Sequence, residues 1–220
     1  MPPQAVFFDM DGVTVDTAVE WQAIEQEEIL PAISEDAIPA AEIRARSITD
    51  TYDSLAAAEE YTLTVTRDEF LQHYDRWAEE IYRDRADLLE GYRDIVDAIR
   101  REGLAVGLVS ASPRRWVEMV LDRFELDGEF DVVLAEDDYE GKSKPSPIPY
   151  RLAAESVGVD PTTAIAVEDS HHGVESAVRA GMECIALRGA GNRDSDLSGA
   201  DVIVADPAAL REALEARLSG

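Results

Sequence analysis

The sequence predicts an α/β protein, in which a doubly wound parallel sheet carries a small all-helical segment inserted after the first strand. After Gly91, short continuous apolar runs alternate with helical patterns, as in parallel strands that helices cover on both faces. Between residues 17 and 85, glycine is absent and Ala, Glu, Ile, Leu and Arg dominate in helical spacing. We therefore expect a core domain of residues 1–16 and 86–220, and an inserted helical domain of residues 17–85, which we call the cap.

Apolar runs of β type locate the expected strands in chain order. The first run covers residues 4–8 and stops at Asp9, which opens an Asp-Met-Asp-Gly turn. We expect further strands at 105–109, 132–135, 164–167, 184–187 and 202–204, and helices at 113–124, 148–157, 173–180 and 207–218. In sheets of this kind the ligand site lies beyond the carboxyl ends of the strands, so functional residues are expected there.

The charge of the chain excludes several classes of partner. Its 220 residues include 47 acidic and 20 basic ones, for a net charge of -27, and the acids are spread along the whole length. Such a surface repels nucleic acid and anionic membranes, so we expect neither as a partner. The only lysines are Lys142 and Lys144. Dispersed acid with scarce lysine predicts adaptation to molar salt; a GC-rich genome would explain the lysines but not the acids.

Cysteine content and the start of the chain indicate the compartment. The single cysteine, Cys184, rules out an internal disulfide and a cysteine-based zinc cluster. The first residues lack the basic start and the apolar stretch of a signal peptide. We expect a cytoplasmic protein that is a monomer or a weak homodimer.

Polar residues follow four of the expected strands, directly or in the next loop: Asp9, Asp11, Ser110, Lys144, Glu168 and Asp169. Carboxylates gathered at one edge repel each other by about 4 kcal/mol per pair at roughly 4 Å and an effective dielectric of about 20. A hard cation with oxygen ligands, Mg²⁺, would relieve this repulsion and leave room for a phosphate group. Hydroxyl and ammonium groups bind phosphate. The pattern therefore predicts phosphoryl transfer.

Four ordered motifs on the same residues resemble the haloacid dehalogenase superfamily of phosphatases. They are Asp9–Thr14 (Asp-Met-Asp-Gly-Val-Thr), Gly107–Ser112, Gly141–Pro147 around Lys144-Pro145, and Val167–Val174 with Glu-Asp-Ser and a later glycine. The resemblance covers the whole chain. It implies a Rossmann-like core with a small helical cap, as in phosphoglycolate phosphatase and β-phosphoglucomutase.

The resemblance implies catalytic and metal-binding roles for four carboxylates. Asp9 would be the nucleophile that takes the phosphoryl group as an aspartyl-phosphate. Asp11 would protonate the leaving oxygen and then deprotonate the attacking water. Asp9, the backbone carbonyl of Asp11 and Asp169 would hold Mg²⁺. Glu168 would bind the metal through water or support a ligand, and its alternative is a solvated carboxylate.

The resemblance also implies a phosphate cradle. Ser110 and the backbone N–H of Ala111 would hold the phosphate, with a helix N-cap as the alternative role for Ser110. Lys144 would neutralise the nucleophile and the phosphate. It is favoured over Lys142 because it directly precedes Pro145, as in the motif.

The cap narrows the choice among the reactions of this superfamily. It contains no lysine for the Schiff base of a phosphonatase, and the presence of Asp11 argues against a dehalogenase. In a β-phosphoglucomutase, a cap histidine would align with Trp21 and a cap arginine with Ile48, while Arg46 is near but shifted. We expect hydrolysis of a small phosphomonoester, phosphoglycolate first, with Trp21 and Arg46 as candidate specificity residues. The alternatives are a sugar phosphomutase and a catalytically idle protein that binds a phosphorylated ligand.

Overall fold

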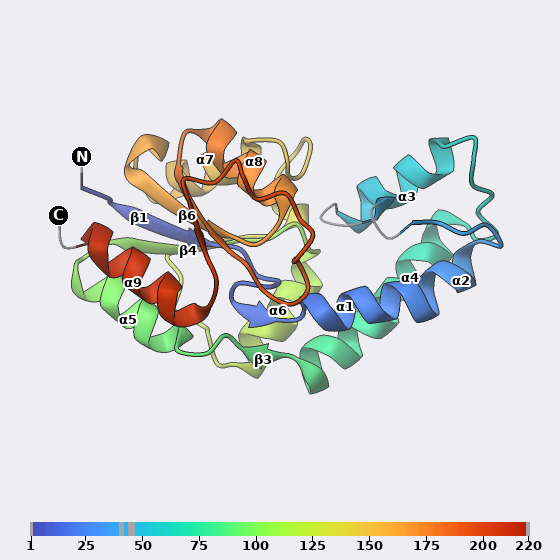
Figure 1. The fold of residues 1–220 in the computed structure, drawn as a ribbon, viewed down its shortest axis with the longest axis horizontal. Coiled ribbons are helices and arrows are strands. Elements are labelled where there is room, and N and C mark those ends of the chain that lie inside the picture. The colour runs from blue at the N-terminus through green and yellow to red at the C-terminus, as the bar shows by residue number, and fades with distance from the viewer. Residues whose placement is uncertain (1, 40–41, 44–46, 219–220) are drawn as a thin grey trace.

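The computed structural model describes residues 2–39, 42–43 and 47–218. Its centre is a parallel sheet of six strands in the order β5-β4-β1-β6-β7-β8 (Figure 1). The strands are β1 (Ala5–Phe8), β4 (Ala105–Val109), β5 (Val132–Leu134), β6 (Ala164–Glu168), β7 (Glu183–Leu187) and β8 (Val202–Val204). The predicted fold class is confirmed, and each of these strands begins and ends within one residue of its predicted limits.

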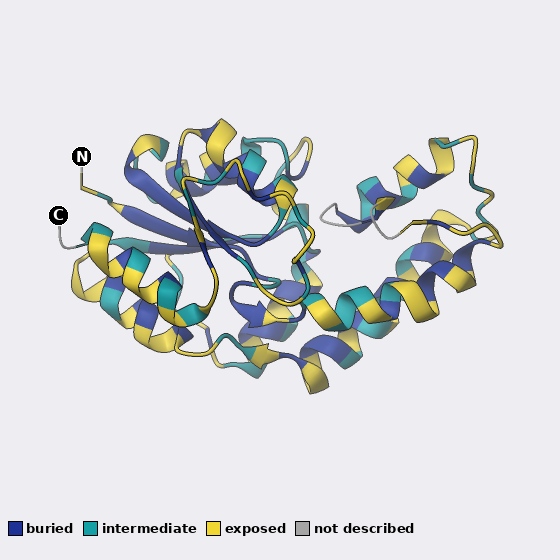
Figure 2. Ribbon diagram, in the orientation of Figure 1, coloured by how far each residue is buried: buried dark blue, intermediate teal, exposed yellow. Residues whose placement is uncertain are grey.

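Helices cover both faces of this sheet, as the continuous apolar strands predicted. One face carries α7 (Ile148–Ser156) and α8 (His171–Ala180), and the other carries α5 (Tyr92–Arg101) and α9 (Pro207–Leu218) (Figure 1). Alternation along β1 divides the core accordingly: Val6 and Phe8 pack on the side of α5, and Phe7 packs on the side of α7. The central strands β1 and β6 are therefore buried throughout their length, whereas the edge strands β5 and β8 are only partly buried (Figure 2).

The connection between the two lobes of the molecule is a small antiparallel pair that the sequence analysis did not predict. β2 (Val15–Asp16) leaves the core and pairs with β3 (Asp87–Leu88), which returns to it. Two-residue strands carry no readable period, so the apolar pattern could not reveal them. Helix α5 was also not predicted, although its buried Ile95, Val96 and Ile99 are spaced for a helix.

Helices form the second lobe, which lies beside the carboxyl ends of the strands (Figure 1). They are α1 (Ala18–Ile24), the π-helical turn η1 (Glu25–Ile29), α2 (Leu30–Ile33), α3 (Ile48–Ala57), α4 (Arg67–Glu80) and the π-helical turn η3 (Ile81–Arg85). In α4, Phe70, Tyr74 and Ala78 are buried against the neighbouring helices. The apolar spacing of this segment thus forms the inner face of the lobe.

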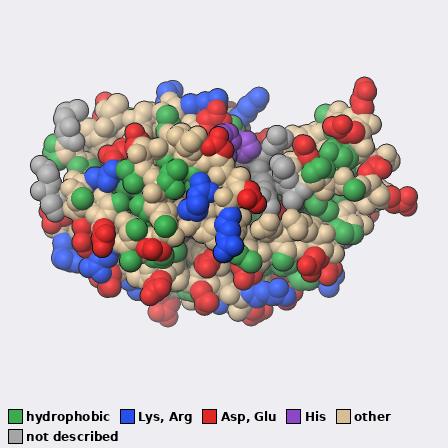
Figure 3. All heavy atoms as spheres, viewed as in Figure 1, with side chains coloured by type: hydrophobic (Ala, Val, Ile, Leu, Met, Phe, Trp, Pro, Cys, Tyr) green, Lys and Arg blue, Asp and Glu red, His purple; other side chains and the backbone are tan. Residues whose placement is uncertain are grey.

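Helix α6 (Arg114–Arg123) belongs to the core but packs against α4 and η3 of the cap. Two short 3-10 turns, η4 (Glu136–Asp138) and η5 (Pro161–Thr163), complete the described elements. No helix in the described ranges combines the length and the apolar character needed to cross a membrane. Figure 3 shows acidic side chains scattered over both lobes of the displayed face instead of gathered in one patch.

Candidate active site

The turn after β1 brings Asp9 and Asp11 to the rim of the sheet. Asp9 follows the last residue of β1, and its backbone carbonyl accepts a hydrogen bond of 2.7 Å from the Thr14 hydroxyl. Gly12 adopts a left-handed conformation with φ of 76°, and a Cβ there would overlap the carboxylate of Asp169. The glycine therefore allows the turn to pack directly against the end of β6.

Lys144 is buried between two carboxylates of this rim. Its ammonium donates to Asp9 Oδ1 at 2.6 Å, to Glu168 Oε1 at 2.6 Å and to the carbonyl of Val109 at 2.8 Å. These bonds use all three N–H donors of the ammonium. Burial lowers the pKa of Lys144, but the Asp9 and Glu168 carboxylates outweigh it and raise this pKa above the ordinary lysine value. Lys142, by contrast, is exposed.

Glu168, the last residue of β6, is fully buried, so its alternative role as a solvated carboxylate is wrong. Its Oε1 accepts hydrogen bonds from Lys144 and from the Tyr150 hydroxyl, each 2.6 Å long. A Cβ at Gly173 would overlap the same carboxylate, so α8 also packs against it. Tyr150 was not foreseen, because its contact with Glu168 depends on where α7 lies on the sheet.

Three carboxylates of this rim form a cluster that fits a divalent cation. Asp9, Glu168 and Asp169 each offer one oxygen, and these oxygens lie within 4.8 Å of one another. Burial, and then the neighbouring Asp9 carboxylate, raises the pKa of Asp169 well above its ordinary value. A buried group of negative charges with hard oxygen donors is the environment that Mg²⁺ favours.

Asn192 fixes Asp169 from the loop after β7, and sequence reasoning missed it. Its side-chain amide donates to the Asp169 carbonyl at 2.7 Å and to the Leu187 carbonyl at 2.9 Å. The Arg188 guanidinium donates to three carbonyls of the same loop, those of Asn192, Arg193 and Ser195. The loop is thereby held as one wall of the site.

The loop after β4 carries Ser110 and Ala111, which we expected to bind phosphate. Ser110 and Ala111 line the same pocket as Asp9 and Lys144. The Ser110 hydroxyl accepts a hydrogen bond of 3.0 Å from the Ser112 backbone N–H. Pro113 is the N-cap residue of α6, so the alternative role of Ser110 as its N-cap is wrong.

The Asp11 carboxylate is held by donors from both sides of the boundary between core and cap. Oδ1 accepts hydrogen bonds from the Thr17 hydroxyl at 2.7 Å and from the Tyr82 hydroxyl at 2.8 Å, and Oδ2 accepts one from the Ser112 hydroxyl at 3.1 Å. Burial raises the pKa of Asp11, while the hydrogen bonds from Thr17, Tyr82 and Ser112 oppose the rise. The protonated form of this carboxyl is therefore more accessible than that of an exposed aspartate.

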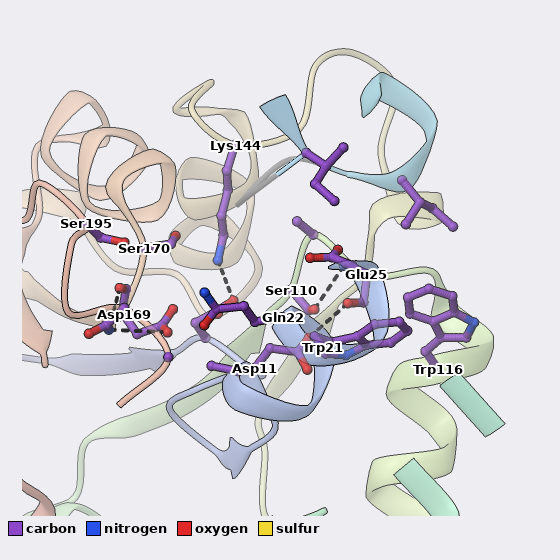
Figure 4. A pocket seen from close by; sticks show the side chains of 18 of the residues that line it. Asp11, Trp21, Gln22, Glu25, Ser110, Trp116, Lys144, Asp169, Ser170 and Ser195 are labelled. Carbon is purple, nitrogen blue, oxygen red and sulfur yellow. Dashed lines mark hydrogen bonds and ion pairs between the residues drawn. The ribbon is translucent and has the colours of Figure 1, made fainter. Parts of the chain in front are cut away.

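One pocket joins the rim to the cap, with about 1040 Å³ of empty space including the part open to solvent. Figure 4 shows Lys144 and Asp169 on one side of it and Trp21 and Trp116 on the other. The two indole rings are stacked, with centroids 5.3 Å apart. Trp21, a candidate specificity residue, lines this pocket, whereas Arg46 falls outside the described residues. The cap wall also includes Gln22, Glu25, Ile43, Ile48 and Tyr74.

Comparisons with known proteins agree with this geometry. The family model of haloacid dehalogenase-like hydrolases matches residues 6–187. An N-acetylmuramic acid 6-phosphate phosphatase of Pseudomonas aeruginosa is 30% identical over 98% of this chain and 96% of its own. Hexitol phosphatase B of Escherichia coli is 32% identical over 83% of this chain and 82% of its own. The crystal structure of CbbY from Rhodobacter sphaeroides in complex with phosphate superposes on this structure with a TM-score of 0.78. The match covers 94% of this chain and 95% of CbbY, at 23% sequence identity.

Proposed function

Because the chain belongs to the haloacid dehalogenase-like hydrolases, we propose that it is a phosphatase that hydrolyses a small-molecule phosphomonoester with the help of Mg²⁺. The observation that carries this proposal is the placement of Asp9. It is a buried carboxylate at the end of β1, paired with Lys144 at 2.6 Å, and it lies in one pocket with Ser110 and Asp11.

In the proposed reaction, Asp9 attacks phosphorus and becomes an aspartyl-phosphate while the alcohol leaves. Lys144 holds Oδ1 of Asp9, which orients the carboxylate. Ser110 and the backbone N–H of Ala111 bind the phosphate oxygens. Bound at Asp9, Asp169 and Glu168, Mg²⁺ would neutralise the charge that gathers on the phosphoryl group.

Asp11 supplies the proton chemistry of both halves of the reaction. It gives a proton to the departing alkoxide, and it then takes one from the water that attacks the aspartyl-phosphate. Its raised pKa suits the first role, because the side chain must arrive protonated. The polar contacts from Thr17 and Ser112 hold it beside the phosphate cradle.

The cap wall bears on the choice of substrate. Phosphoglycolate remains the first candidate from the sequence. The indole rings of Trp21 and Trp116, with the polar groups of Gln22 and Glu25, form a wall that also suits a hydroxylated carbon chain. Hexitol and amino-sugar phosphates, which the names of two relatives indicate, therefore belong in the same comparison. A sugar phosphomutase ranks lower, because the cap contains no lysine.

Phosphate release from a broad panel of metabolite monophosphates, measured in molar KCl with Mg²⁺, tests the function. We expect turnover of at least one alkyl phosphate, and loss of turnover with a chelator and in Asp9→Asn. Conversion of β-glucose 1-phosphate to glucose 6-phosphate with a bisphosphate primer would support the mutase instead. Tight binding without turnover would support an idle ligand-binding protein. We further propose a cytoplasmic protein, monomeric or weakly dimeric, that has neither nucleic acid nor membrane as a partner.

A further inference from the structure

Tyr82 is a fully buried residue of η3 whose hydroxyl reaches across from the cap to Asp11. The bond from its hydroxyl to Asp11 Oδ1 is 2.8 Å long, although the two residues are 71 positions apart in the chain. Tyr82 has no role in the proposed reaction itself. Its contact is with the carboxylate that would move protons in that reaction.

The direction of this hydrogen bond is set by a third residue. The indole N–H of Trp21 donates to the Tyr82 oxygen at 3.0 Å. Because an indole N–H can only donate, the Tyr82 oxygen acts as acceptor on that side, and its single proton is free to point to Asp11. Trp21 is itself fixed by stacking on Trp116 of the core, with an interplanar angle of 19°.

The two oxygens of Asp11 consequently have different surroundings. Oδ1 receives two O–H donors, from Tyr82 and Thr17, which occupy both of its lone-pair directions. Within the described part of the chain, Oδ2 receives one donor, from Ser112 of the loop that carries Ser110, so one of its lone-pair directions is left. That oxygen lies on the side of the phosphate cradle.

We propose that Tyr82 is a positioning residue, which holds Oδ1 of Asp11 together with Thr17 so that Oδ2 is the oxygen presented to the leaving group. The inference rests on the proposed phosphatase function. Thr17 follows β2 and Tyr82 precedes β3, so the two donors come from the two connections between core and cap. The position of the cap and the orientation of Asp11 are then coupled, because a displacement of the cap would remove both hydroxyl donors from Asp11.

The test is the variant Tyr82→Phe, which removes the hydroxyl and keeps the ring. We would measure kcat/KM for phenyl phosphate and for 4-nitrophenyl phosphate, which have similar shapes but differ in how much the departing phenol needs a proton. A poorly oriented acid should slow phenyl phosphate about tenfold more than 4-nitrophenyl phosphate, since a hydrogen bond to a charged group is worth roughly that factor. The loss should lie in kcat, with KM little changed.

Tyr92→Phe is the matched control, because Tyr92 is also buried but lies in the core, and among the described residues its hydroxyl has no hydrogen-bond partner, whereas that of Tyr82 donates to Asp11. This variant should lower kcat/KM only slightly, and by the same factor for both substrates. Trp21→Phe, which loses the N–H that orients the Tyr82 hydroxyl, should show the same selectivity more weakly. It also decides the question if Tyr82→Phe does not fold, as judged by its melting temperature.

The outcomes separate the inference from the function on which it rests. If a folded Tyr82→Phe variant loses kcat/KM equally for both substrates, or loses none, the positioning role is overturned. The proposed phosphatase function is then unaffected. A wild-type protein that cleaves neither of these phosphates nor any member of the metabolite panel would overturn the proposed function and the inference with it.

Discussion

The two walls of the pocket are held in place by different forces. At the sheet, Asp9 and Asp169 follow strands whose backbones are hydrogen-bonded to neighbours on both sides, and every residue of β1 and β6 is buried. At the cap, Trp21, Ile43 and Tyr74 come from separate segments that meet through side-chain contacts: apolar packing and single hydrogen bonds such as Trp21–Tyr82 and Tyr74–Glu25. The sheet can therefore keep reacting groups in fixed positions, whereas the cap wall can change with single substitutions. Substitutions at the two walls should differ in kind as well as in size.

The largest effect is expected at the sheet wall. Asp9→Asn should abolish turnover of every substrate, because no nucleophile remains. Asp11→Asn should still be phosphorylated by an aryl phosphate with an acidic phenol but should fail to release the phosphate. Intact-protein mass after acid quench should show about one added phosphoryl group in Asp11→Asn and none in Asp9→Asn. Equal turnover of aryl and alkyl phosphates by Asp11→Asn would remove Asp11 from the mechanism.

The second effect tests whether the sheet wall depends on its buried cation. Lys144→Met leaves the Asp9 and Glu168 carboxylates buried without their partner, which should cost about 3–5 kcal/mol of unfolding free energy. Lys142→Met is the matched control, because that side chain is exposed, and it should change stability by less than about 0.5 kcal/mol. Urea unfolding measures both. Similar midpoints for the two variants would contradict the geometry around Lys144.

The third effect concerns the carboxylate cluster. Because the pKa of Asp169 is raised in the folded state, the folded protein binds more protons there than the unfolded chain does, and stability should fall as pH rises above the ordinary value of this group. Mg²⁺ can replace the proton, so it should raise the melting temperature more at pH 8 than at pH 5.5. Asp169→Asn should remove most of this gain. A Mg²⁺ effect that is independent of pH and persists in the variant would argue against a metal site there.

The fourth effect moves to the cap wall and should be smaller. Gln22→Ala should raise KM for the preferred substrate several-fold while kcat changes by less than about twofold, because the residue lines the pocket from the cap and has no part in the proposed reaction. Gln26→Ala, an exposed position in the next turn of the same segment, should change neither value. A large fall in kcat would mean that the cap wall takes part in the chemistry.

The smallest effect is expected from salt, which acts on both lobes. With a net charge of -27, the folded protein should melt at a higher temperature in molar KCl than in low-salt buffer, because screening reduces the repulsion between acids. Sucrose at matched osmolality is the control for general exclusion from the surface. Equal stabilisation by sucrose would contradict adaptation to salt.

The same contrast explains what could be predicted from the sequence. The fold class was predictable because the strands are continuous apolar runs and the helices between them are amphipathic. Asp9, Ser110 and Asp169 were found because they directly follow such strands, and parallel strands end at one rim. Four short motifs carried the family resemblance, and each is local in the chain.

The contacts that were missed are those made between distant segments. Tyr82 meets Asp11 only once the cap has folded back, and Tyr150 meets Glu168 only once α7 lies on the sheet. Asn192 lies in an irregular loop with no period or motif to mark it. Each of these three is an ordinary polar or aromatic residue in a helix or loop. The spacing of residues along the sequence cannot distinguish such a residue from one on the surface.

The contrast between the two lysines has a practical consequence for labelling the protein. Lys144 has its ammonium enclosed by three acceptors, whereas Lys142 is exposed on the same loop, and the chain has no other lysine. Apart from the N-terminal amine, an amine-reactive dye or linker applied to the folded protein should therefore attach to one side chain, that of Lys142. That residue would provide a defined lysine handle for immobilisation, two positions from a group that chemical modification can reach only after unfolding.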